Sequence, residues 1–178
     1  MKRYTMGISL ICALIGTNIH AVDVEDGVKN FTKSKDWVSF SIAEPTFGRI
    51  VATRAGTEDS RLNTTLTLTY PTNKKCVLAP TELIIKLENP IKAADSSEIF
   101  GTVQIDDNNP IGVEATLQND EDAYFVFITM PIKDFDKKIQ NSKSLIVNFK
   151  GFGVMNFSLS GANIAINNAA STCKNFSF

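Results

Sequence analysis

The side chains that could do chemistry in this chain are mostly carboxylates, and they cluster in its second half. Asp106 and Asp107 open the run DDNNP, Glu114 follows, and Glu121 and Asp122 lie in a second acidic run. Paired carboxylates can hydrolyse glycosidic bonds, and carboxylate oxygens can bind calcium. Asp and Asn are, however, ordinary turn formers at hairpin tips, and neither run has the alternating ligand spacing of a calcium loop. We predict no catalytic residue and no metal ligand here.

The first 21 residues have the pattern of a secretory signal peptide. Lys2 and Arg3 form a charged start, a largely apolar run covers 6–15, and Ala21 is the small residue before the cleavage point. A membrane anchor is the alternative, but a bilayer span needs about 20 apolar residues and this run has roughly half of that. We predict a signal peptide over 1–21 and no membrane insertion after its cleavage.

Cleavage would change which reactions the chain can support. His20 is the single histidine, so the mature protein would contain none. Histidine is the usual base beside a nucleophilic serine or cysteine, and it is the commonest metal-binding side chain. No glycine-rich phosphate loop appears in the sequence either. We therefore predict a protein that is not an enzyme and that holds no cofactor.

The charge balance argues against two classes of partner. The chain has 18 basic and 19 acidic side chains, and removal of Lys2 and Arg3 shifts the net charge from −1 to about −3. Nucleic acids and anionic lipid surfaces are bound through basic patches. We therefore predict that the chain does not bind nucleic acid and that its partner is another protein.

Two cysteines remain after the predicted cleavage, at positions 76 and 173. In an exported chain a pair of this kind indicates a disulfide bond, and the alternative is two free buried thiols. We predict the disulfide Cys76–Cys173 and a location in the periplasm or outside the cell.

Short alternating segments separated by turns indicate a mainly β fold. The clearest is LNTTLTLTY at 62–70, and YFVFITM at 124–130 is apolar on both faces and therefore central in its sheet. The segment 144–173 reads as a hairpin followed by a short helix. We predict an antiparallel β-sandwich-like domain of about eight strands with a short C-terminal helix. It would cover 37–178 as a single β-rich domain, after a mobile lead-in at 22–36.

Two loops contain the side chains best suited to recognition. The segment 43–49 combines Pro45 with Phe47 and Arg49, and aromatic and arginine side chains dominate interface energetics. The hairpin tip at 106–112 adds the carboxylates of Asp106 and Asp107. We predict that Phe47, Arg49, Asp106 and Asp107 bind the partner. The alternative is that Phe47 packs inward and the two acids only form a turn.

The layout resembles known small exported bacterial proteins. It rests on Trp37, the strand 62–70, the run VQIDDNNP, and NFKGFGVMNFSLSGANIAI followed by Cys173. The chain is similar in these features to the invasion-associated locus B family and to the TagO-like accessory proteins of type VI secretion. It departs from them by having Tyr70 where related chains often place a cysteine. The resemblance implies a periplasmic, non-enzymatic β-rich domain, linked in the first family to host-cell association and virulence.

These observations predict an exported, non-enzymatic protein-binding domain. An immunity or inhibitor protein that neutralises a cell-wall hydrolase or another toxin is the alternative, because a protruding acidic loop can fill a cationic cleft.

Overall fold

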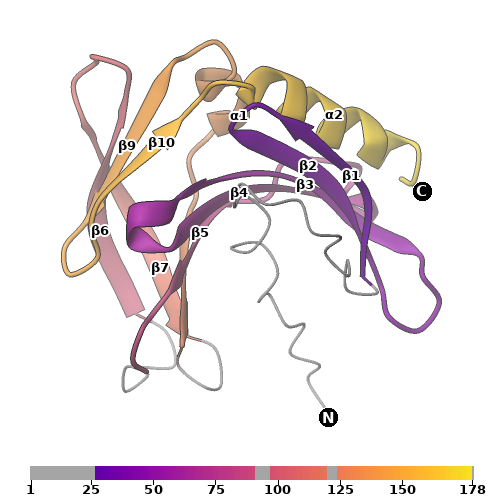
Figure 1. Cartoon of the computed structure of the whole chain (residues 1–178), viewed down its shortest axis with the longest axis horizontal. Coiled ribbons are helices and arrows are strands. Elements are labelled where there is room, and N and C mark those ends of the chain that lie inside the picture. The colour runs from indigo at the N-terminus through magenta and orange to yellow at the C-terminus, as the bar shows by residue number, and fades with distance from the viewer. Residues whose placement is uncertain (1–26, 91–96, 120–123, 178) are drawn as a thin grey trace.

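Ten antiparallel strands form one continuous sheet in the computed structural model, and a C-terminal helix packs against it (Figure 1). The structure describes residues 27–90, 97–119 and 124–177. The predicted mainly β class, the antiparallel pairing and the C-terminal helix are confirmed. The signal peptide at 1–21 and the start of the lead-in lie outside the described residues.

The strands follow one another in the sheet in the order β1-β2-β3-β4-β5-β8-β7-β6-β9-β10. Their bounds are β1 Val28–Ser34, β2 Trp37–Ala43, β3 Ile50–Asp59, β4 Thr64–Pro71, β5 Thr81–Lys86, β6 Ser97–Ile105, β7 Ile111–Asn119, β8 Phe125–Met130, β9 Ser144–Phe149 and β10 Gly153–Ser158. The helices are α1 Phe135–Ile139 and α2 Ala162–Lys174, with 3-10 turns at Ser60–Leu62 (η1) and Thr72–Lys74 (η2).

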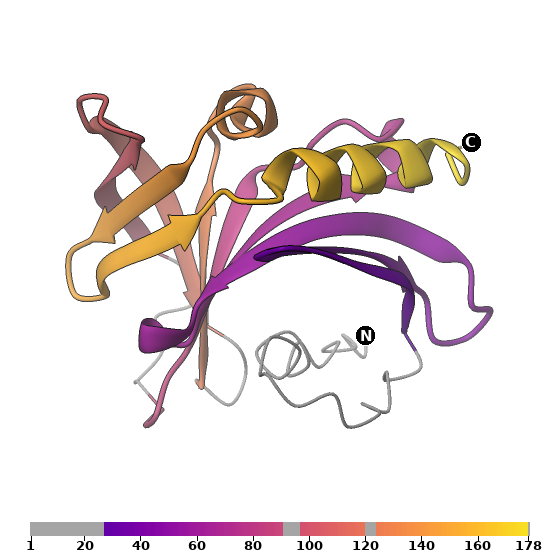
Figure 2. The same cartoon turned by 45° about the horizontal axis from the view of Figure 1, so that its top comes forward.

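Two details differ from the sequence prediction. Val28–Ser34, inside the expected lead-in, forms β1 and pairs with β2. As an edge strand, β1 leaves most of its side chains exposed, so it lacks the alternating pattern of a half-buried strand. The strands also join a single sheet that folds over on itself, whereas a sandwich has two separate sheets. Figure 2 shows this bend between the arched β1–β4 and the β6–β10 half.

Strand alternation sets the core. In β4, Leu66, Leu68 and Tyr70 are buried in the main cluster, while the threonines between them occupy the opposite face. β8 lies between β5 and β7, so its predicted central position is confirmed. The opposite face of the first strands has a smaller cluster around Val38 and Phe40.

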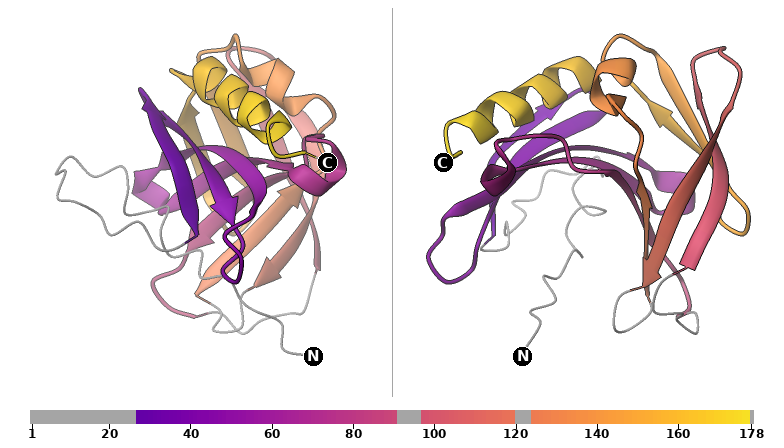
Figure 3. Two further views of the ribbon diagram at one scale, coloured as in Figure 1. Left: turned by 90° about the vertical axis from the view of Figure 1, so that its right-hand side faces the viewer. Right: turned by 180° about the vertical axis from the view of Figure 1, so that it is seen from behind.

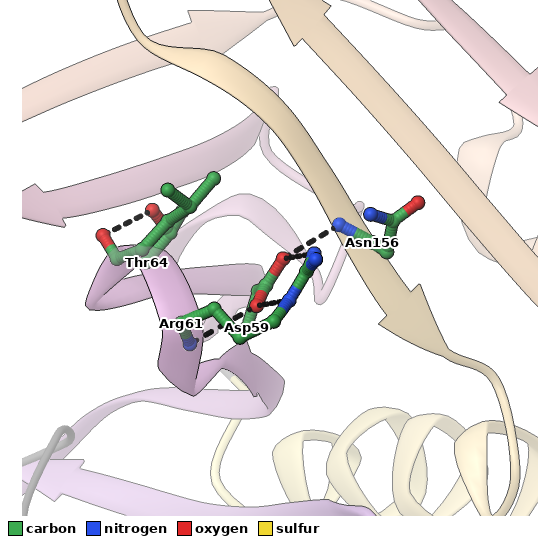
Figure 4. Close-up of polar contacts among 5 residues, drawn as sticks. Asp59, Arg61, Thr64 and Asn156 are labelled. Atoms are coloured by element: carbon green, nitrogen blue, oxygen red, sulfur yellow. Dashed lines mark hydrogen bonds and ion pairs between the residues drawn. The ribbon is translucent and has the colours of Figure 1, made fainter.

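The fold brings β10 back to the N-terminal strands through side chains. The buried Trp37 donates a hydrogen bond from Nε1 to the Ser158 carbonyl at 2.9 Å. Asp59 accepts one from the Asn156 backbone N–H at 2.8 Å, and Arg61 Nη2 donates to the same carboxylate at 2.7 Å (Figure 4). Part of the outer edge of β10 is therefore paired without a further strand.

Helix α2 lies close to the sheet because its contact residues are small. Ala162, Ala165 and Ala169 are buried with Ile166, and the Ala169 carbonyl accepts a hydrogen bond from Thr53 Oγ1 at 2.7 Å. The helix is preceded by Gly161 with φ +93°, and a Cβ there would overlap the Ser34 carbonyl. Only glycine fits this contact between the β1–β2 turn and the start of α2.

A disulfide joins Cys76 to Cys173, as the sequence predicted, with the Cα atoms 5.8 Å apart. It ties the last turn of α2 to the segment between β4 and β5.

Replacement of Cys173 by serine should lower the melting temperature of the oxidised protein. The bond closes a loop with a sequence separation of 97 residues, and a loop of that size contributes about 4–5 kcal/mol in the chain-entropy account. Thermal denaturation followed by circular dichroism measures the effect. Cys76→Ser is the matched control and should cause the same loss. Two free thiols in mass spectra of protein made in an oxidising compartment would contradict the prediction.

Asp59→Asn should destabilise the protein by about 1–3 kcal/mol at neutral pH. Burial opposes the charged form of Asp59, but hydrogen bonds from Arg61 and Asn156 outweigh it and hold the pKa of this carboxyl below its ordinary value. The resulting stability is present above the ordinary pKa and is lost as the pH falls through the lowered one. The difference between the variant and the wild type should therefore shrink below about pH 4.

Urea denaturation over a pH series measures this difference. Asp107→Asn, at an exposed position, is the control and should change little. A deficit for Asp59→Asn that stays constant at acidic pH would show that the charge of Asp59 is not what β10 requires.

Candidate functional site

The structure exposes the first predicted recognition loop. Phe47 is 84% exposed, so the alternative that it packs inward is wrong. Arg49 is also exposed and forms an ion pair with Glu44, with Nε and Oε1 3.5 Å apart. Both side chains are accessible to a partner, and their role in binding stays a prediction.

The second predicted loop is built differently. The Asp106 carboxylate accepts hydrogen bonds from the backbone N–H groups of Lys143 and Ser144, at 2.7 and 3.0 Å. These bonds hold the pKa of Asp106 below its ordinary value and fasten the β6–β7 hairpin to the start of β9. Asp106 therefore has a structural task at this turn, whereas the side chain of Asp107 is exposed.

The two loops do not form one surface. The loop between β2 and β3 and the turn between β6 and β7 lie at opposite ends of the molecule in Figures 1 and 3. Of the other carboxylates that could do chemistry, Glu114 is exposed on β7, and Glu121 and Asp122 lie outside the described residues. No group of three or more His, Cys, Asp or Glu side chains suited to a metal occurs in the described part of the chain.

A groove of about 560 Å³ lies beside the disulfide, and we call it the disulfide groove. It is formed by the end of β4, the segment before β5, the segment after β8, α1, and the last turns of α2. Thr81 pairs with Met130 at the end of the β5–β8 ladder. Pro80 and Pro131, which are adjacent to them in the sequence, are therefore neighbours at the edge where both strands end. Proline has no N–H to continue the ladder, which explains why the sheet ends here.

The groove has an apolar floor and an exposed apolar side chain. Leu78 and Ile132 are partly buried against the core, and Cys76, which also lines the groove, is bonded to Cys173 of α2. Val77 is 66% exposed, and its backbone N–H is bound to the Lys74 carbonyl at 3.1 Å. Because its backbone is fixed and its side chain is exposed, Val77 can contact an apolar group of a partner.

Lysines surround the disulfide groove. Lys133, Lys137 and Lys174 line it, and Lys74 and Lys75 directly precede Cys76. Lys137 binds Asp134, with Nζ and Oδ1 2.9 Å apart. In the described ranges the other four lysines form no ion pair. This side of a protein with a net charge of −1 is therefore basic.

The second acid of the groove is also engaged by the protein itself. Asp136 accepts hydrogen bonds from the Tyr70 hydroxyl at 3.2 Å and from the Lys137 backbone N–H at 2.9 Å. Burial, and then the negative charge of Asp136, raises the pKa of Tyr70 above its ordinary value. The phenol therefore keeps its proton and acts as a donor that fixes α1 against β4.

Sequence reasoning missed this basic surface, although one signal for it was present. A disulfide between residues 76 and 173 necessarily places Lys74 and Lys75 near Lys174. The contribution of Lys133 and Lys137 depends on the position of α1, which the sequence pattern alone does not fix.

Comparisons with known proteins add little. No family model matches the chain, and no curated protein matches it significantly. Among solved structures, invasion-associated protein B from Bartonella henselae is similar, at 13% identity, over 82% of this chain and 99% of that chain, with a TM-score of 0.42. The resemblance is a loose one. Similarity to the TagO-like proteins stays a prediction. No helix in the described ranges is long and apolar enough to cross a membrane.

Proposed function

We propose that this protein is an exported, non-enzymatic protein-binding domain that acts through the disulfide groove. The observation that supports it most is the exposed Val77 beside an apolar floor, with five lysines nearby, of which only Lys137 forms an ion pair within the described residues. Stable interfaces combine an apolar centre with a polar or charged rim, so the groove has the composition of one half of an interface.

The charges of the groove define the chemistry of the partner. Four lysines that form no ion pair with another described residue attract a surface rich in Asp and Glu, and the exposed Val77 favours an apolar side chain beside those acids. The apolar floor favours a protein over a nucleic acid, which would bring phosphates and no apolar anchor. The partner is therefore an acidic protein surface with an apolar residue at its centre.

The disulfide also supports an exported setting, because such bonds persist in oxidising compartments. Host association and toxin neutralisation are both compatible with this kind of binding. The inhibitor alternative relied on an acidic hairpin that enters a cationic cleft. Since the Asp106 carboxylate is occupied by its own backbone contacts, that hairpin would present Asp107 alone.

The groove can be tested by capture experiments in periplasmic and extracellular extracts, with each captured protein identified and then titrated in pure form. Val77→Ser and the pair Lys133→Glu with Lys174→Glu should weaken binding of the same acidic partner about tenfold. Melting temperatures should stay nearly unchanged, since all three side chains are exposed. Added salt should weaken binding of the wild type.

Phe47→Ala is the matched control, because it also removes an exposed apolar side chain. It should leave binding unchanged. If Phe47→Ala or Asp107→Ala weakens binding while Val77→Ser does not, the loops predicted from the sequence form the site and the disulfide groove does not.

The absence of catalysis is a separate prediction. Purified protein should not turn over peptidoglycan, esters or peptides, because the described residues offer no histidine, and the two acids of the disulfide groove are engaged by Lys137 and Tyr70. Release of product from any of these substrates, abolished by one Asp or Glu substitution, would overturn this part of the proposal.

A further inference from the structure

A second cavity lies on the other side of α2, between this helix, β1 and β2. Its volume is about 620 Å³, within the range of small-molecule sites. We call it the amide pocket. None of the residues that line it is Asp, Glu, Lys or Arg. Its composition therefore differs from that of the lysine-rich disulfide groove.

Short neutral polar residues make up most of the sheet side of the amide pocket. Ser39 and Ser41 point to the face that elsewhere contributes to the core, and both are buried. Thr32 pairs with Ser39 across the strands. Asn30, at a break in the β1–β2 register, has φ +56° and donates from Nδ2 to Ser41 Oγ at 3.1 Å. The irregularity in β1 thus brings a carboxamide to the pocket.

The helix side adds a polar stripe. Asn168, Thr172 and Asn175 are spaced by four and three residues, so they lie on one flank of α2. The groups that face the disulfide groove, Ala170 and Lys174, lie on the opposite flank. The two cavities are therefore separate, and a ligand in one need not disturb the other.

Several polar groups of the amide pocket have no partner in the described ranges. The hydroxyls of Ser39 and Thr172 and the carboxamide of Asn168 form no side-chain hydrogen bond with another described residue. Hydroxyls and carboxamides both donate and accept, so these groups can bind a ligand that does the same. Phe31 and Phe176 also belong to the lining, and Phe31 is 39% exposed.

From this lining we propose that the amide pocket binds a neutral saccharide. A sugar ring presents hydroxyls that donate and accept hydrogen bonds at its rim and an apolar C–H face, which match the amide and hydroxyl groups and the two phenyl rings. A charged ligand would leave its charge without a counterion inside the cavity.

An extended peptide is the main alternative, and it fits less well. A peptide strand would add to the outer edge of β1 through main-chain hydrogen bonds. The amide pocket instead lies over the faces of β1 and β2, since Ser39, Phe40 and Ser41 of the second strand line it. A ligand in this pocket therefore contacts side-chain hydroxyls and carboxamides, which are the groups that bind sugar hydroxyls.

The test uses the mature protein and a panel of neutral mono- and oligosaccharides of glucose, galactose, mannose and N-acetylglucosamine, with sialyllactose as a charged comparison. A neutral tetrapeptide is titrated in parallel. Binding is followed by NMR chemical-shift perturbation and calorimetry. At least one neutral saccharide should bind saturably, with shifts at β1, β2 and α2. Asn168→Ala and Phe31→Ala should each weaken that binding about tenfold.

Asn167→Ala is the matched control on the same helix, because Asn167 hydrogen-bonds to Asn163 and does not line the pocket. It should leave saccharide binding unchanged. Three results would overturn the proposal: no saturable binding of any neutral saccharide, binding that neither Asn168→Ala nor Phe31→Ala weakens, or peptide binding at this pocket without saccharide binding.

Discussion

The packing of α2 on the first strands is the constraint on which the rest of the structure depends. Alanines let the helix backbone approach so closely that Thr53 bonds to the Ala169 carbonyl, and Gly161 admits the β1–β2 turn at the helix start. The disulfide at Cys173 fixes the other end. Because both ends are held, each flank of the helix can form the wall of a cavity. The basic groove and the neutral pocket therefore share α2 as a wall, while α1 and the end of β4 contribute to the groove and β1 and β2 contribute to the pocket.

The strands were predictable where one face is buried, because burial imposes alternation. Leu66 and Leu68, which alternate with threonines, indicate β4. The apolar residues on both faces of β8 indicate a strand in the middle of the sheet. β1 was not predicted because this edge strand is held mainly by backbone hydrogen bonds. Most of its side chains are exposed, so burial imposes no alternating pattern on the sequence KNFTKS. Local pattern also cannot say whether strands form two sheets or one. That depends on the β5–β8 and β6–β9 pairings, which join segments far apart in the chain.

The candidate sites were less predictable than the fold. The lysines of the groove come from three segments that meet only through the disulfide and the placement of α1. The amide pocket needs a register break at Asn30 opposite a helix flank near the C-terminus, and neither feature has a sequence signature of its own. Phe47 and Asp106 were chosen because their residue types suit recognition. The structure distinguishes the two residues. The Phe47 side chain is exposed, whereas the Asp106 carboxylate accepts hydrogen bonds from the Lys143 and Ser144 backbone.

The attachment of β10 has a consequence for how the chain acquires its structure. Trp37 finds its acceptor 121 residues later, and Asp59 finds the Asn156 N–H 97 residues later. Contacts this distant in sequence form slowly, because a long loop must close before they contribute. During synthesis from the N-terminus, the first three strands remain without β10 and α2 until nearly the whole sequence has been made. The Trp37 indole stays without its acceptor for that time, and the Asp59 carboxylate has only its contacts with Arg61. Incomplete sheets of this kind are prone to aggregation, so the period before β10 is made is the one in which this chain is most exposed to it.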